Sequence, residues 1–133
     1  MSIRRSTYLS RFTQLSIFGL LLAVASKWYA GPGQSIVRGH LGDVLIVFAV
    51  YFLLRAVLPW LEPLRSAIAV ITLAFTVELF QGVGIFNSKL SPFAAYWLGQ
   101  HFDLLDMLAY VLGAALSLFV EQQLSGRARK SPD

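Results

Sequence analysis

Carboxylates and an imidazole stand within long apolar stretches of this chain, where such side chains can bind a cation or transfer a proton. A charged side chain at bilayer depth costs roughly 2.5–3.5 kcal/mol on insertion scales, so residues kept there usually have a function. Three apolar runs carry them, in the pairs His40 and Asp43, Glu78 and Gln81, and Asp103 and Asp106. The sequence therefore predicts a polar site inside a membrane protein.

The composition is typical of membrane proteins. Of the 133 residues, 56% are hydrophobic and only 14% are charged, whereas a soluble domain has about 25% charged residues. The absence of cysteine excludes disulfides and thiol chemistry. The net charge of +4 comes from basic residues scattered over loops and chain ends, which does not favour nucleic acid as a partner.

The apolar runs predict an all-α fold, a four-helix transmembrane bundle forming one integral membrane domain over residues 1–133. Crossing about 30 Å of hydrocarbon takes about 20 apolar residues in a helix. Glycine, proline and asparagine mark the breaks between runs. The predicted spans are residues 12–30, 40–58, 66–86 and 103–122.

The stretch before the last span predicts a short interfacial helix over residues 91–99. Ser91 suits the N-cap, Pro92 the first helical position and Gly99 the C-terminal stop. Its apolar residues are typical of a helix that lies in the membrane interface. Such a helix would be either a plain connector or a lid over the polar site.

The basic residues predict a protein of the bacterial inner (plasma) membrane with both termini cytoplasmic. In that orientation only Lys27, Arg38 and Lys89 of the eleven basic residues lie outside, as the positive-inside rule requires. The first run has an alternative interpretation as a cleaved signal peptide, with Ala23-Val24-Ala25 as the cleavage motif. Its length and the aromatic pair Trp28-Tyr29 favour a retained span.

Helical periodicity predicts that the polar residues converge. Residues three or four apart share a helix face, and neighbouring spans alternate in direction, so the polar stripes of the last three spans meet in the outer half of the membrane. The predicted site residues are His40, Asp43, Glu78, Gln81, Asp103, Asp106 and Tyr110.

Some residues on these faces have simpler interpretations. Asp103 can be a helix cap, because free backbone N–H groups favour a carboxylate there. Arg55 is expected to extend its guanidinium to the cytoplasmic interface. Small residues that recur every four positions predict close helix contacts; these are Ala109, Gly113 and Ser117, and Gly19 and Ala23.

From His40 onward the chain resembles a bacterial family of small integral membrane proteins known as domain of unknown function 2809. The resemblance covers about the last two thirds of the chain, and its ordered combination is more specific than any single piece. The residues that carry it are Gly39-His40, Gly42-Asp43, Leu53-Leu54-Arg55, Glu78-Leu79, Gln81, Leu98-Gly99, Phe102, Asp106, Tyr110 and Gly113. It implies a multi-pass bacterial membrane protein of unestablished activity.

The chain is also distantly similar to VanZ-like membrane proteins, one of which is associated with teicoplanin resistance. The shared elements are Glu78-x-x-Gln81, Asp103-x-x-Asp106 and the following Gly113. Tyr110 stands where VanZ-like proteins tend to have a small polar residue, so a resistance role is not transferred.

Three functions compete for the polar site. One is a module that binds or moves a small cation, a proton or a lipid head group, because nearby carboxylates can share a proton. Another is a metal-assisted enzyme acting on a lipid or cell-wall precursor, because carboxylate oxygens bind divalent cations and His40 can shuttle protons. The third is a structural or partner-binding membrane subunit, with the acids paired to Arg38, His40, Lys89 or His101.

The sequence predicts no bound cofactor, although the acids are suited to a divalent cation. The expected partners are the lipid bilayer and either further copies of the chain or another membrane protein. Four short spans make a poor transporter alone, which favours an oligomer if transport is the function.

Overall fold

A computed structural model describes residues 2–82 and 104–129, with side chains for residues 6–80 and 104–126. The described residues are helical or lie in short turns, and none of them forms a strand. The all-α prediction is therefore confirmed, while the predicted interfacial helix over 91–99 lies outside the described residues. The helices are α1 (Ser2–Lys27), α2 (Gln34–Ile36), the π-helix η1 (Val37–Leu41), α3 (Gly42–Val57), α4 (Pro63–Gly82) and α6 (Leu104–Arg129).

Four helical stretches are long and apolar enough to cross a membrane, as the sequence predicts. They are Ser6–Lys27, Gln34–Val57, Pro63–Phe80 and Leu104–Gly126. Helix α1 begins at Ser2 rather than near residue 12, because the residues before the apolar run continue the helix beyond its hydrophobic part. The second stretch also begins earlier than residue 40, since α2, η1 and α3 follow one another without a break.

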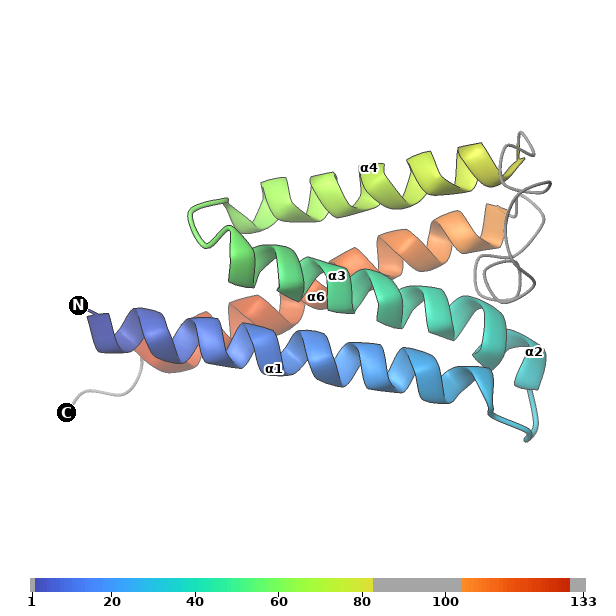
Figure 1. The fold of residues 1–133 in the computed structure, drawn as a ribbon, viewed down its shortest axis with the longest axis horizontal. Coiled ribbons are helices and arrows are strands. Elements are labelled where there is room, and N and C mark those ends of the chain that lie inside the picture. Colours follow the sequence, from blue (N-terminus) through green and yellow to red (C-terminus); the bar gives the residue numbers. More distant parts are fainter. Residues whose placement is uncertain (1, 83–103, 130–133) are drawn as a thin grey trace.

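The turns have the local chemistry that the sequence indicates. Gly33, which precedes α2, has a φ of 69°, in the left-handed region that a residue with a Cβ rarely adopts. Pro63 is the first residue of α4, where the missing N–H costs nothing. These two turns reverse the chain and allow neighbouring long helices to run antiparallel (Figure 1).

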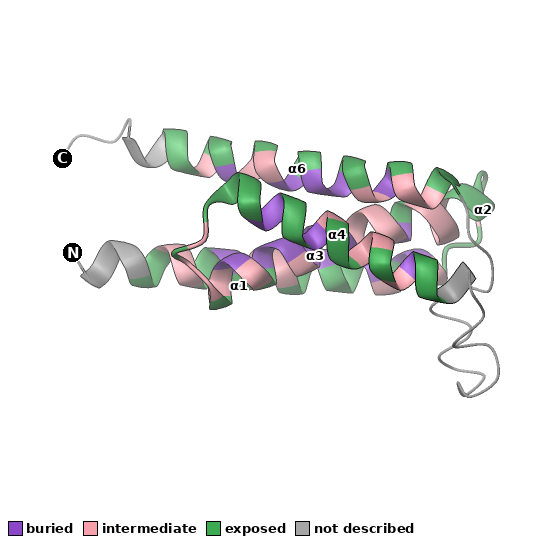
Figure 2. Ribbon diagram, turned by 90° about the horizontal axis from the view of Figure 1, so that it is seen from above, coloured by how far each residue is buried: buried purple, intermediate pink, exposed green. Residues whose placement is uncertain are grey.

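The long helices form one bundle in which α3 contacts α1, α4 and α6 (Figure 1). The end of the bundle that holds Ser2, residues 58–62 and Arg129 is called the terminal end below, because α1 begins there and α6 ends there. The opposite end, which holds residues 28–33, α2 and Leu104, is called the distal end. Figure 2 shows that buried residues face the middle of the bundle and exposed ones face outward.

Aromatic side chains of α1 and α3 make up much of the core. The Phe52 ring lies 5.6 Å from Phe12, 4.8 Å from Phe48 and 5.1 Å from Tyr51, measured between ring centroids. By contrast, large apolar side chains on the outer faces are exposed, including Leu21. An apolar outer surface is what a lipid environment requires, because lipid tails are as apolar as these side chains.

Small residues allow close contacts between helices, as predicted. A Cβ on Gly113 of α6 would lie 2.7 Å from the Val44 carbonyl oxygen and 2.9 Å from Val47 Cβ, both on α3. A Cβ on Gly19 of α1 would lie 2.8 Å from Phe48 Cδ1. Glycine permits both approaches, and the one at Gly113 brings the polar faces of α3 and α6 together.

Candidate functional site

Three polar side chains from three segments meet at the distal end. His40 Nδ1 lies 2.9 Å from Asp106 Oδ1, and one ligand atom from each of His40, Asp43 and Asp106 lies within 4.8 Å of the other two. These residues are called the triad below. All three side chains are partly buried, so the group is neither a surface cluster nor sealed inside the bundle.

Local backbone structure brings the triad together. His40 lies in η1, a π-helix of five residues, and Asp43 lies in the first turn of α3 that follows it. A π-turn widens the helix by one residue, and such turns often occur at functional sites. Asp106 lies in the first turn of α6, where the helix dipole stabilises a carboxylate.

A lysine from α1 completes the charge pattern around the triad. Lys27 Nζ donates a hydrogen bond of 2.8 Å to the Arg38 carbonyl oxygen, and its charge acts on Asp43. Asp43 and Asp106 each have a carboxylate oxygen within 4.8 Å of the other, and the carboxyl group of Glu78 acts on Asp43 through space. Among the described residues, the groups that act on or belong to the triad are therefore three carboxyl groups, one lysine and one imidazole.

Glu78 is the most buried of the predicted acids whose side chains the structure describes, and it has a hydrogen-bond partner. Its side chain is buried in α4, with 2% of its surface exposed. Tyr110 of α6 donates its hydroxyl to Glu78 Oε2 over 2.9 Å. This bond joins α4 to α6 one helical turn further into the bundle than Asp106, because Tyr110 follows Asp106 by four residues.

The structure brings together most of the predicted site and leaves two members undescribed. His40, Asp43 and Asp106 form the triad, and Glu78 pairs with Tyr110 beside it. Asp103 lies outside the described residues, as do Lys89 and His101. The backbone of Gln81 lies in α4, and its side chain is outside the described set.

The triad has the donors for a cation. An imidazole nitrogen with two carboxylate oxygens suits a transition-metal ion such as Mn²⁺ or Zn²⁺ better than Mg²⁺ or Ca²⁺, which prefer oxygen alone. Two ligands of one ion at about 2.0–2.2 Å each can be at most about 4.4 Å apart. The two ligand atoms that lie farthest apart, at up to 4.8 Å, would therefore have to move slightly closer together to bind one ion.

A second polar cluster at the terminal end was not predicted. Arg55 Nη2 lies 2.6 Å from Glu121 Oε1, and Tyr51 donates its hydroxyl to Glu121 Oε2 over 2.5 Å. Glu121 is 4% exposed and Arg55 is 8% exposed. The prediction that Arg55 extends to the interface is wrong, because a carboxylate inside the bundle pairs with its guanidinium.

One signal in the sequence could have revealed Glu121. The small-residue face formed by Ala109, Gly113 and Ser117 advances four residues at a time, and Glu121 is its next member. A residue on a helix-contact face is buried, so an acid there needs a cation on the facing helix. Arg55 lies on the predicted polar stripe of the neighbouring helix.

Comparison with known proteins connects this fold to one family. No curated protein matches the chain, and no solved structure matches it. Residues 33–114 match the family described as Protein of unknown function (DUF2809). The match includes the whole triad, Glu78 and Tyr110, and it ends at the residue after Gly113. Because it spans more than half of the sequence, the chain belongs to the DUF2809 family.

Proposed function

We propose that this chain is a bacterial plasma-membrane protein that binds a divalent cation at the triad, on the outer side of the membrane. The single observation that supports the proposal most is the convergence of His40, Asp43 and Asp106 within 4.8 Å from η1, α3 and α6. Three ligands from three segments couple cation binding to the packing of the distal end. Both termini are cytoplasmic in this proposal, because most basic residues are at the terminal end.

The charge around the triad supports a cation rather than an anion. Asp43, Asp106 and the nearby Glu78 supply three carboxyl groups, and Lys27 is the described lysine that interacts with Asp43. A bound divalent ion would neutralise the two triad carboxylates directly. Three protein ligands leave coordination positions open for water or a lipid-linked group, which would also suit the alternative of a metal-assisted enzyme.

A purely structural role for the triad is the main competitor. The His40–Asp106 contact of 2.9 Å would then simply join η1 to α6, as an ion pair or a hydrogen bond. That role does not use Asp43, whereas a cation site requires it. The distant similarity to VanZ-like proteins remains part of the proposal and adds no activity to it.

Calorimetric titration of the purified protein in detergent micelles with Mn²⁺ or Zn²⁺ tests the proposal. We expect one ion per chain, with an affinity that falls by at least about tenfold in Asp106→Asn and in Asp43→Asn. Glu62→Gln is the matched control, because Glu62 is an exposed acid at the terminal end. Equal affinities of the wild type and both triad variants would overturn the cation site and leave the structural role.

A further inference from the structure

A lysine at the end of α1 lies against the segment that carries the triad. Lys27 is the last residue of α1, and its Nζ donates a hydrogen bond of 2.8 Å to the Arg38 carbonyl oxygen of η1. A Cβ on Gly42, the residue before Asp43, would lie 3.6 Å from Lys27 Nζ. The ammonium group therefore lies against the backbone where η1 passes into α3.

The π-helix changes the partners of the Arg38 carbonyl group. In an α-helix this carbonyl would accept the N–H of Gly42, four residues further along the chain. The Gly42 N–H donates to the Gly39 carbonyl oxygen instead. Lys27 thus donates to a carbonyl that does not have its α-helical partner, in the same short helix that positions His40.

Lys27 acts on the triad through its charge rather than through a direct ion pair. No described carboxylate oxygen lies within 4.0 Å of Lys27 Nζ. Its positive charge nevertheless acts on the Asp43 carboxyl group. Both side chains are partly buried, and salt screens partly buried charges less than exposed ones. The interaction between them therefore persists at physiological ionic strength.

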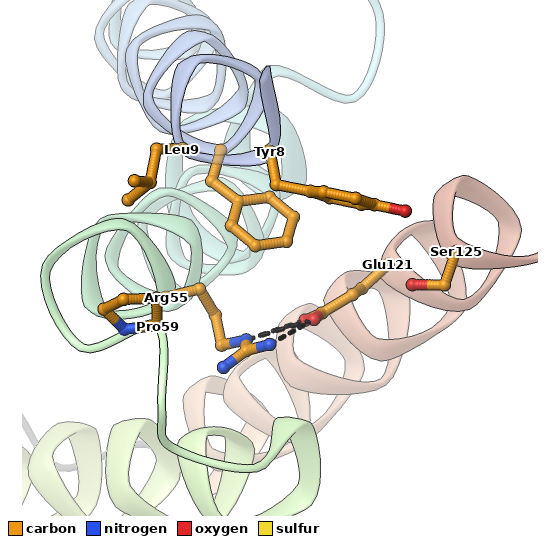
Figure 3. Close-up of a pocket in the computed structure, with 7 residues that line it drawn as sticks. Tyr8, Leu9, Arg55, Pro59, Glu121 and Ser125 are labelled. Atoms are coloured by element: carbon orange, nitrogen blue, oxygen red, sulfur yellow. Dashed lines mark hydrogen bonds and ion pairs between the residues drawn. The ribbon is translucent and has the colours of Figure 1, made fainter. Parts of the chain in front are cut away.

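The buried cation at the terminal end is held differently. The guanidinium of Arg55 forms an ion pair with Glu121, whose Oε1 is 2.6 Å from Arg55 Nη2 (Figure 3). That carboxylate is committed to its arginine. The carboxylate on which the Lys27 charge acts belongs instead to the candidate cation site. Lys27 therefore shares its counter-charge with any ion that binds there.

A positive charge beside a cation site lowers the affinity of that site. The carboxylates of Asp43 and Asp106 offer two negative charges to a bound divalent ion, and the Lys27 ammonium offsets one of them. Proteins commonly set their affinity for Ca²⁺ through the number of charged ligands, and the same Coulomb energy applies to a neighbouring charge that is not a ligand. The site still favours a cation, but less strongly than it would without the lysine.

We propose that Lys27 is an internal counter-ion of the triad, which balances the Asp43 carboxylate in the empty site and lowers the affinity for a divalent cation. This inference rests on the proposed cation site. A bound ion is repelled by the ammonium group and exchanges more readily than it would from the triad alone. A purely structural lysine would have the opposite effect, because its removal would loosen η1, which carries His40, and weaken ion binding.

The test uses the absence of cysteine from the chain. Lys27→Cys is alkylated with bromoethylamine, which gives a side chain of the length and charge of lysine, or with bromopropane, which gives a neutral side chain of the same length. Ser35→Cys, treated with the same two reagents, is the matched control, because Ser35 is exposed and at the distal end. Calorimetric titration of each purified protein in detergent micelles with Mn²⁺ measures the affinity.

We expect the neutral form of Lys27→Cys to bind Mn²⁺ about tenfold more tightly than the aminoethyl form, which should have the affinity of the wild type. The two forms of Ser35→Cys should bind Mn²⁺ equally, because an exposed charge is screened. If the wild type binds Mn²⁺ and the neutral form of Lys27→Cys binds it equally or more weakly, the counter-ion role is overturned and the cation site stands. A wild type that binds no Mn²⁺ would reject the cation site and this inference with it.

Discussion

Asp106 Oδ1 on α6 lies 2.9 Å from His40 Nδ1 on η1, although 66 residues separate them in the sequence. With Asp43 of α3 beside them, this contact joins η1 to α6, two of the three segments that carry the proposed cation ligands. The contact depends on the close approach of α3 and α6, because Gly113 allows α6 to touch the α3 backbone.

Gly113→Ala should destabilise the bundle by about 1–3 kcal/mol, the usual cost of overpacking. The added methyl group would meet the Val44 carbonyl oxygen at 2.7 Å, so α3 and α6 must separate. Thermal unfolding in detergent micelles measures the effect. Gly126→Ala is the control, because a Cβ there has nothing within 4 Å; equal melting temperatures for the two variants would show that α3 and α6 are not in close contact.

Glu121→Ala should destabilise the protein by about 3–5 kcal/mol, because it leaves the Arg55 guanidinium buried without a counter-charge. Glu62→Gln should change stability by less than about 1 kcal/mol, since its contact with Arg65 is exposed. Denaturant unfolding measures both changes in stability. The double variant Arg55→Met/Glu121→Leu should regain most of the lost stability. A double variant that is less stable than Glu121→Ala would contradict the buried pair.

Tyr110→Phe should cost about 1–3 kcal/mol, because buried Glu78 loses the hydroxyl that donates to it. If the two groups interact as described, the effect of Tyr110→Phe should be much smaller in a Glu78→Leu background. A double-mutant cycle of unfolding free energies measures this coupling. A coupling energy of zero would mean that the two side chains do not meet in solution.

Labelling of single cysteines tests the orientation, and the absence of native cysteine makes it simple. In intact bacterial cells, a membrane-impermeant maleimide should label Ser35→Cys at the distal end. It should label Trp60→Cys at the terminal end only after the membrane is broken. The reverse pattern would place the triad on the cytoplasmic side and reject the proposed orientation.

The four helices and much of the candidate site could be predicted from the sequence, because hydrophobic length and helical period are local properties. The spacing of His40 and Asp43, and of Asp106 and Tyr110, is three or four residues, which by itself places each pair on one helix face. The π-turn at Val37–Leu41 was not predicted, since it depends on how the chain enters the bundle.

The pairing of Arg55 with Glu121 also could not be read from local pattern alone. A lone arginine near the end of a span is usually expected to reach the interface. Its true environment depends on a carboxylate 66 residues away, brought near by helix packing. Tertiary contact, rather than the depth of the residue in its own helix, decided where the guanidinium lies.

Electron spin echo spectroscopy of Mn²⁺ bound to the purified protein tests the proposed cation site most directly, because it detects nitrogen ligands of the ion. We predict one bound Mn²⁺ per chain, with a nitrogen coupling from an imidazole that disappears in His40→Gln while the ion remains weakly bound to Asp43 and Asp106. No specific Mn²⁺ binding, or a nitrogen coupling that is unchanged in His40→Gln, would contradict the assignment of the triad as a cation site.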